Sequence, residues 1–211
     1  MHKFLLIMFL TFPGFPVFAQ YPGFSPVNDI SSFKIKFSAE TQKVSTIKSD
    51  FIQEKNLAML ADKITSKGKF WFKKSNLVRM EYDKPYPYLM VINKDKVWVK
   101  DRQKESTINT RSNKMFQQIN RVMIDCMQGT VFSNSDFNTK LFEDKTSVLI
   151  EMTPVSKGLK EMFAHINLLV SKKDFSVASI NMTEPSGDNT LIRFINKEQN
   201  VQLPDNLFSV H

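Results

Sequence analysis

The residue types that most often carry catalysis or bind metals are scarce in this sequence. Of the three histidines, His2 and His211 lie at the ends of the chain, and His165 falls in an alternating apolar stretch. A serine–histidine–aspartate triad would depend on His165 or His211. The single cysteine, Cys126, excludes a disulfide framework and an all-cysteine metal site. HExxH, serine-elbow and phosphate-binding glycine motifs are absent. The sequence therefore predicts no enzyme, no metal and no cofactor, and an esterase would need His165.

Export is the clearest prediction that the sequence makes. Lys3 precedes an apolar run over residues 4–10, and a stretch with proline and glycine then ends at Ala19 in a form that signal peptidase cleaves. The run is well short of the roughly 20 residues that span a bilayer. We expect residues 1–19 to be a cleaved signal peptide and residues 20–211 to form a single domain. Because no cysteine follows Ala19 directly, we expect no lipid anchor there.

Composition and charge are those of an ordinary globular domain. Hydrophobic residues make up 42% of the chain and charged residues 24%, which suffices for a core without disulfides or metals. Lysines occur throughout and the formal net charge is +8, so we expect an evenly basic surface suited to anionic lipid head groups, to an acidic partner, or simply to solubility. Aromatic and basic residues alternate over residues 69–74, as in single-strand nucleic-acid binders. A half-buried strand explains that segment equally well, and we expect no nucleic-acid partner for an exported protein.

Two segments have the periodicity of amphipathic helices. The first covers residues 30–48, where Ser31 or Ser32 would cap the start. Its apolar stripe consists of Phe33, Phe37, Val44 and Ile47. The second covers residues 112–129, where Gly129 can end the helix. Its broad apolar face consists of Met115, Phe116, Ile119, Met123 and Ile124.

Elsewhere the apolar residues alternate with period two, which is typical of half-buried antiparallel strands. Over residues 77–82, for example, Val78, Met80 and Tyr82 share one face of the strand. We predict strands that begin near residues 49, 68, 77, 88, 97, 105, 140, 147, 164, 175 and 189, with a short helical turn within residues 154–162. The predicted fold class is therefore α+β, with about eleven antiparallel strands and two or three helices.

A long antiparallel meander curls because its strands twist, so its inner apolar face needs a cover. The two helices are the available covers, and periodicity alone leaves open whether they pack tightly on the sheet or enclose a cavity. The many methionines favour a cavity, because this flexible side chain suits a surface that repacks against different apolar partners. The residues that we expect in the cavity wall or the covering helix are Val78, Met80, Tyr82, Met90, Met115, Phe116, Ile119, Met123, Phe163, Ile180 and Met182.

Several blocks of the sequence resemble a known family, the periplasmic lipoprotein carriers of the LolA type. A phenylalanine-x-glutamine strand ends at Gln53, a serine-x-glycine-x-phenylalanine block covers residues 66–70, and an asparagine-leucine-x-arginine-x-x-tyrosine block covers residues 76–82. Further similar positions include Trp98 and the Thr153-Pro154 pair, so the resemblance covers nearly all of the chain beyond the signal.

This resemblance implies an incomplete, half-open antiparallel β-barrel of about eleven strands covered by a helical lid, with a cavity for the acyl chains of a lipoprotein. It also implies a periplasmic carrier that receives cargo from an inner-membrane ATP-driven extractor and delivers it to an outer-membrane receptor. We expect a monomer. Lys74 matches a position where the family has an arginine that links lid opening to cargo, and a lysine cannot form the same planar fork. Because of this departure, a non-proteinaceous lipid or a glycolipid stays open as the alternative cargo.

Overall fold

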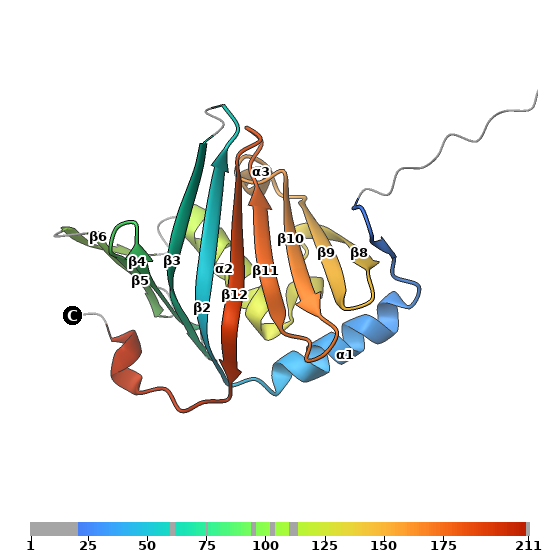
Figure 1. Cartoon of the computed structure of the whole chain (residues 1–211), viewed down its shortest axis with the longest axis horizontal. Helices are drawn as coiled ribbons and strands as arrows, with labels where there is room; N and C mark the ends of the chain where they lie inside the picture. Colours follow the sequence, from blue (N-terminus) through green and yellow to red (C-terminus); the bar gives the residue numbers. More distant parts are fainter. Residues whose placement is uncertain are drawn as a thin grey trace, which may run out of the picture.

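The described strands form one antiparallel sheet of twelve, in the order β1-β8-β9-β10-β11-β12-β2-β3-β4-β5-β6-β7. Figure 1 shows this open sheet with α2 against one side, which we call the inner face, and with α1 along the lower ends of β8 to β11. The computed structural model describes residues 21–59, 62–74, 76–93, 96–101, 104–109 and 114–209, except for the side chains of residues 108–109 and 114–120.

The elements follow the predicted alternation of strands and helices. The strands are β1 (Ser25–Pro26), β2 (Thr46–Leu57), β3 (Asp62–Lys73), β4 (Leu77–Lys84), β5 (Tyr88–Asn93), β6 (Lys96–Asp101), β7 (Lys104–Asn109), β8 (Phe137–Glu143), β9 (Ser147–Pro154), β10 (His165–Ser171), β11 (Val177–Thr183) and β12 (Asn189–Gln199). The helices are α1 (Ile30–Gln42), α2 (Lys114–Gln128) and α3 (Lys157–Lys160), with short 3-10 turns η2 (Val131–Ser133) and η3 (Asp205–Phe208).

The open sheet confirms the predicted fold class. Its two ends are β1 and β7, so the strands do not close into a barrel. We count twelve strands rather than about eleven because Ser25 and Pro26 pair with Glu143 and Phe142 at the β8 end. The first long strand, β2, pairs over most of its length with the last strand, β12. This pairing joins the two halves of the chain in the middle of the sheet.

Helix α1 is shorter than predicted, and a different residue caps it. The side chain of Asp29, not Ser31 or Ser32, accepts a hydrogen bond from the backbone N–H of Ser32 at 2.9 Å. The helix ends at Gln42 because the chain continues as β2 a few residues later. The helical spacing of Val44 and Ile47 was therefore a coincidence of a helix end and a strand start.

Helix α2 ends where predicted, at Gly129, which has a φ of +69°. A Cβ at this position would lie 2.0 Å from the Oγ1 atom of Thr41 in α1. Glycine is therefore required both by the backbone conformation and by the close approach of the two helices. Residues 112 and 113 of the predicted helix lie outside the described residues.

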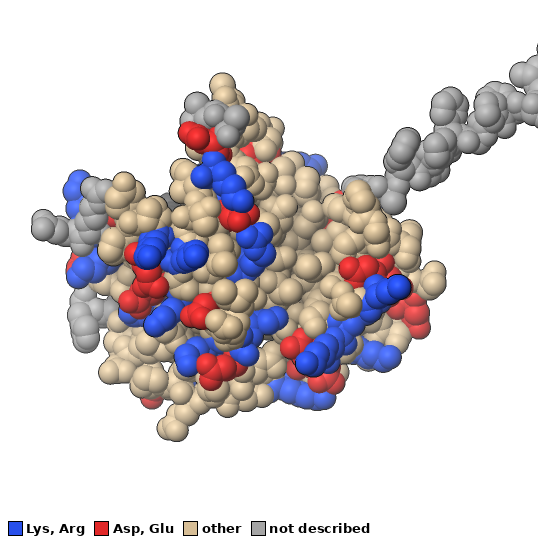
Figure 2. Space-filling model, in the orientation of Figure 1, with Lys and Arg blue, Asp and Glu red and all other residues tan. Residues whose placement is uncertain are grey.

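The two faces of the sheet differ in what covers them. The main apolar core lies on the inner face beneath α1 and α2. On the outer face a smaller cluster, with Val91, Leu203 and Phe208 buried, forms where the chain after β12 crosses β4 and β5. Figure 2 views the molecule from the outer side and shows basic and acidic side chains interspersed. The even basic surface that we expected is thus not seen on this side, where, for example, both Lys63 and Arg193 pair with Glu54. Among the described helices, none has the length and apolar character needed to cross a membrane.

Candidate functional site

The inner faces of β4 and β5 carry four of the predicted site residues. Val78, Met80 and Tyr82 alternate along β4, and Met90 lies opposite Met80 on β5. Val78 and Met80 are buried, whereas Tyr82 and Met90 are half-buried. All four pack in the same apolar cluster as Met123 of α2. The structure therefore brings the helix and these strands into one core.

An apolar cavity of about 50 Å³ lies between α2 and the inner faces of β10, β11 and β12. Its lining residues are the predicted Met123, Phe163, Ile180 and Met182, together with Val122, Ile166 and Ile192. Sequence reasoning missed the last three, although alternation gave a signal for two of them. Ile166 and Ile192 each lie in a strand where buried apolar residues recur at every second position.

The lining of this cavity determines what it can do chemically. Its side chains offer hydrocarbon and thioether groups only, so it can bind an apolar group by excluding water but has no acid, base or nucleophile. Pockets for small molecules usually enclose roughly 300–1,000 Å³, several times more than this cavity. The structure therefore shows a closed arrangement, and an acyl chain can enter only if the walls move apart.

Three predicted lid residues lie on the first half of α2. Met115, Phe116 and Ile119 fall within the helix, as expected, but their side chains lie outside the described part of the structure. Their contact with the sheet stays a prediction. The second half of α2 does face the sheet, because Val122, Cys126 and Met127 are buried there.

Lys74, the predicted latch residue, lies in the turn between β3 and β4. Its Nζ atom donates a hydrogen bond to the carbonyl oxygen of Gln42, the last residue of α1, at 2.8 Å. A cation at this end of a helix is favourable because the last carbonyl groups carry partial negative charge. The same turn contacts α2 through Asn76, whose Oδ1 atom accepts from the side chain of Gln128 at 3.3 Å. The turn thus touches both covering helices, and Lys74 contacts α1.

Tyr82 adds a polar group to the inner face of β4, next to the apolar Val78 and Met80. Its hydroxyl donates a hydrogen bond to the Oε1 atom of Gln53 on β2 at 2.9 Å. Burial raises the pKa of Tyr82, so the hydroxyl stays protonated at neutral pH. Gln53 is directly opposite Ile192 of the cavity wall in the sheet, and its amide lies on the other side of β2, toward Tyr82.

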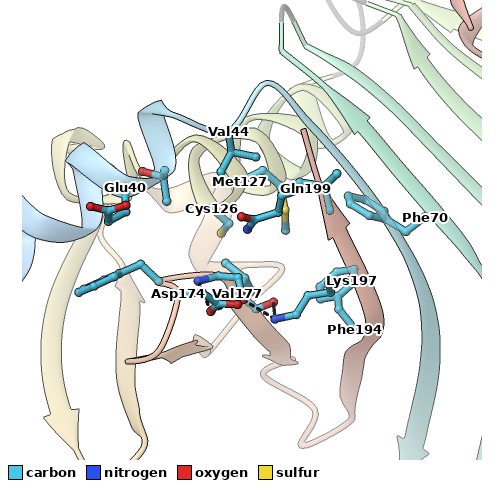
Figure 3. Close-up of a pocket in the computed structure, with 14 residues that line it drawn as sticks. Glu40, Val44, Phe70, Cys126, Met127, Asp174, Val177, Phe194, Lys197 and Gln199 are labelled. Atoms are coloured by element: carbon cyan, nitrogen blue, oxygen red, sulfur yellow. Dashed lines mark hydrogen bonds between the residues drawn. The ribbon is translucent and has the colours of Figure 1, made fainter. Parts of the chain in front are cut away.

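A second, smaller hollow of about 20 Å³ lies between the helix ends and the C-terminal part of β12 (Figure 3). Lys197 reaches into it and donates to Ser176 Oγ at 2.5 Å and to the carbonyl oxygen of Val177 at 3.1 Å. Burial lowers the pKa of Lys197, and burial also raises the pKa of the fully enclosed Cys126 thiol. The thiol therefore packs as a small apolar group, and the hollow has room for little more than water.

Together, the fold and the cavity define a class of protein: an open antiparallel sheet whose inner face is covered by helices that enclose a small, purely apolar space. Residues 42–211 match the sequence profile of a family described as "Outer membrane lipoprotein carrier protein LolA". The chain belongs to this family. The resemblance that the sequence motifs indicated is thereby confirmed.

Two solved structures with TM-scores above 0.5 share the fold at low sequence identity, and a third is similar with a lower score. An uncharacterized conserved protein from Thermus thermophilus is similar with a TM-score of 0.51 and 12% identity, over 86% of this chain and 94% of that one. MucB is similar with a TM-score of 0.51 and 11% identity, over 89% of this chain and 65% of MucB. A LolA superfamily protein from Nitrosomonas europaea has a TM-score of 0.45 and 10% identity, over 84% of this chain and 97% of that one. No curated protein matches the chain.

Proposed function

We propose that this protein is a periplasmic carrier that binds the acyl chains of lipoproteins under α2 and shuttles them from the inner to the outer membrane. The observation that carries the proposal is the purely apolar cavity between α2 and β10–β12, in a chain of the LolA family. The carrier makes and breaks no bond. His165, the one histidine that an esterase would need, lies on β10 next to Ile166 and so points to the opposite, outer face.

The small size of the cavity supports a gated mechanism. Burying an acyl chain gains about 0.8 kcal/mol for each methylene, so a permanently open site would hold its cargo too tightly to release it. When α2 packs on the sheet, the empty site buries much of its own apolar surface. Cargo must displace α2 to enter, and the net affinity is the small difference between these two packed states.

The partners follow from this role. Cargo would come from an ATP-driven extractor in the inner membrane and pass to a receptor at the outer membrane, and the carrier would act as a monomer. Cleavage after Ala19 would release it into the periplasm.

The alternative function keeps the fold but changes the cargo to a non-proteinaceous lipid or a glycolipid. Lys74 favours this alternative, because the lysine replaces the arginine that the family resemblance places at the lid and its Nζ atom binds the end of α1. An all-apolar wall selects acyl chains but cannot by itself distinguish a lipoprotein from a lipid.

Native mass spectrometry of the protein isolated from its own periplasm tests both functions. A bound triacylated peptide is expected for the lipoprotein carrier, and a bound free lipid would favour the alternative. A parallel titration with a fluorescent palmitoylated lipopeptide measures uptake directly. If no acyl ligand co-purifies and the labelled lipopeptide does not bind, both functions are wrong.

A further inference from the structure

Two polar side chains meet on the inner face across an intervening strand. Tyr82 on β4 and Gln53 on β2 are joined by a hydrogen bond although β3 lies between them. Gly68 on β3 makes this possible, since a Cβ there would lie 2.9 Å from the ring of Phe51 and 2.0 Å from a backbone oxygen of β4. The ring of Phe51 passes over this glycine and meets that of Tyr82 with centroids 4.8 Å apart. The sheet is thus built so that side chains of β2 and β4 touch.

The inner-facing residues of β2 change in character along the strand. Phe51 is buried, Gln53 is half-buried, and Lys55 forms an ion pair with Glu184 at 3.8 Å in which both side chains are about 40% exposed. The order is therefore apolar group, neutral amide, charge. An acylated molecule has the same order from its tail through its ester or amide linkage to its polar head. In the sheet Gln53 pairs with Ile192 of the cavity wall, so its position on β2 borders the cavity, and its amide reaches from there over β3 to Tyr82.

The side-chain amide of Gln53 has hydrogen-bonding capacity left over. Its oxygen accepts from Tyr82, and within the described part of the chain no acceptor pairs with its amide nitrogen. Two N–H groups are therefore available on the inner face of the sheet, at a strand that borders the cavity wall. The group that most needs such donors is a carbonyl oxygen that leaves water together with an acyl chain, because it loses its water hydrogen bonds on entry.

We propose that Gln53, held in place by Tyr82, binds the carbonyl oxygen of the ester or amide that joins an acyl chain to its head group. This inference rests on the proposed carrier function and adds one polar contact between the protein and its cargo. The site then recognises acyl esters and amides in preference to plain alkyl chains. Tyr82 is a positioning residue, because it fixes the amide through the oxygen and leaves the nitrogen for the ligand.

Matched ester and ether ligands test the contact. The purified full chain would be titrated with a synthetic diacylated lipopeptide and with its dialkyl ether analogue, which lacks only the carbonyl groups. The same titration is repeated with an ester lysophospholipid and its ether analogue. An ester preference confined to the lipopeptide pair points to a lipoprotein as the source of the carbonyl, and one confined to the lysophospholipid pair points to a lipid. The variants are Gln53→Leu and Tyr82→Phe, and the control is Tyr88→Phe, which removes a neighbouring tyrosine hydroxyl outside the pair.

We expect the unsubstituted protein to bind the ester about fivefold more tightly than the ether, as one net hydrogen bond provides. Gln53→Leu should abolish this preference while ether binding stays the same, and Tyr82→Phe should reduce the preference. The control Tyr88→Phe should retain it.

If the ester and the ether bind equally to every form, the Tyr82–Gln53 hydrogen bond only ties strands together. The inference is then wrong while the carrier function stands. If neither ligand binds the unsubstituted protein, the carrier function itself fails. Thermal melts of each variant separate loss of contact from loss of fold.

Discussion

Helices α1 and α2 both enclose the main apolar core but are attached in different ways. Helix α1 is anchored by aromatic rings: Phe37 is fully buried, and Phe33 stacks on it with centroids 5.7 Å apart and also packs against Phe132 and Phe175. Helix α2, in contrast, contributes Met123 to the wall of a cavity. Lifting α1 would break ring contacts that nothing replaces. Lifting α2 would exchange contacts across a cavity for contacts with an acyl chain.

The ends of the two helices reinforce this contrast. Lys74 ties the last turn of α1 to the turn between β3 and β4, while Asp29 caps the first turn within the helix itself. In the part of α2 whose side chains are described, residues 121–128, the carboxylate of Asp125 accepts from Thr130 and Asn134, each at 2.7 Å, and Gln128 donates to Asn76. The comparison supports our proposal that α1 is a permanent part of the core and that α2 is the removable cover.

The largest expected effect is on α1. Phe37→Ala should lower the free energy of unfolding by about 3–5 kcal/mol, because it deletes a fully buried ring from the centre of an aromatic cluster. Urea unfolding followed by circular dichroism measures the loss. Ile35→Ala on the exposed side of the same helix serves as the control and should change stability by less than about 0.5 kcal/mol. A loss below about 1 kcal/mol for Phe37→Ala would mean that α1 is not anchored by its rings.

The second effect is on acyl uptake. Met123→Asp should weaken binding of a fluorescent palmitoylated lipopeptide at least about tenfold, because it places a charge in the apolar wall, and the protein should still fold. We expect the same of Phe116→Asp on the grounds of helix periodicity. Met59→Asp, at a methionine that is 92% exposed, is the matched control and should bind normally. If both α2 variants unfold while the control does not, α2 belongs to the permanent core and the proposed gating by α2 is wrong.

A smaller effect is expected from filling the cavity. Ile180→Phe adds volume to the empty space under α2, so unfolding should cost about 0.5–1 kcal/mol more, while uptake of the labelled lipopeptide falls about fivefold because the closed state gains stability. Ile195→Phe, at a half-exposed site on β12, should change neither quantity appreciably. Unchanged uptake by Ile180→Phe would place the acyl chains elsewhere.

The smallest effect concerns the latch. Lys74→Met should lower the free energy of unfolding by about 0.5 kcal/mol, because it removes the cation that binds the last carbonyl group of α1. Uptake of the lipopeptide should change by less than about twofold. Lys74→Arg should preserve both stability and uptake. Chemical unfolding and lipopeptide titration of the two variants decide the matter. A several-fold rise in uptake for Lys74→Met would show instead that this lysine restrains the cover.

Much of the fold was predictable because large apolar residues mark the inner face of most strands. The exceptions are segments where this marking fails. The first half of β3, from Asp62 to Lys67, carries mostly exposed polar side chains, so its alternation was not visible and the strand was predicted to begin near Gly68. Strand β1 has only two residues and exists through its partner β8. Such pairing is decided by tertiary contacts, which a local pattern does not report.

The site shows the same division between local and tertiary information. Met123, Ile180 and Met182 converge on one cavity because helical and strand periodicity each fix the face on which a side chain lies. Phe163 joins them from the segment between α3 and β10. The contact of Lys74 with α1 depends on where a turn between two strands falls relative to a distant helix end. No spacing in the sequence encodes that distance.

The position of β12 has a consequence for how the chain matures. The sheet is joined in its middle by a strand that starts at Asn189, near the end of the sequence, and pairs with one that starts at Thr46. Until that late strand is available, β2 and β11 each have an unpaired edge, and the long loop between them must be closed before the pairing gives any stability. The hydrogen bonds that join the two halves of the sheet therefore form only when nearly the whole chain is present.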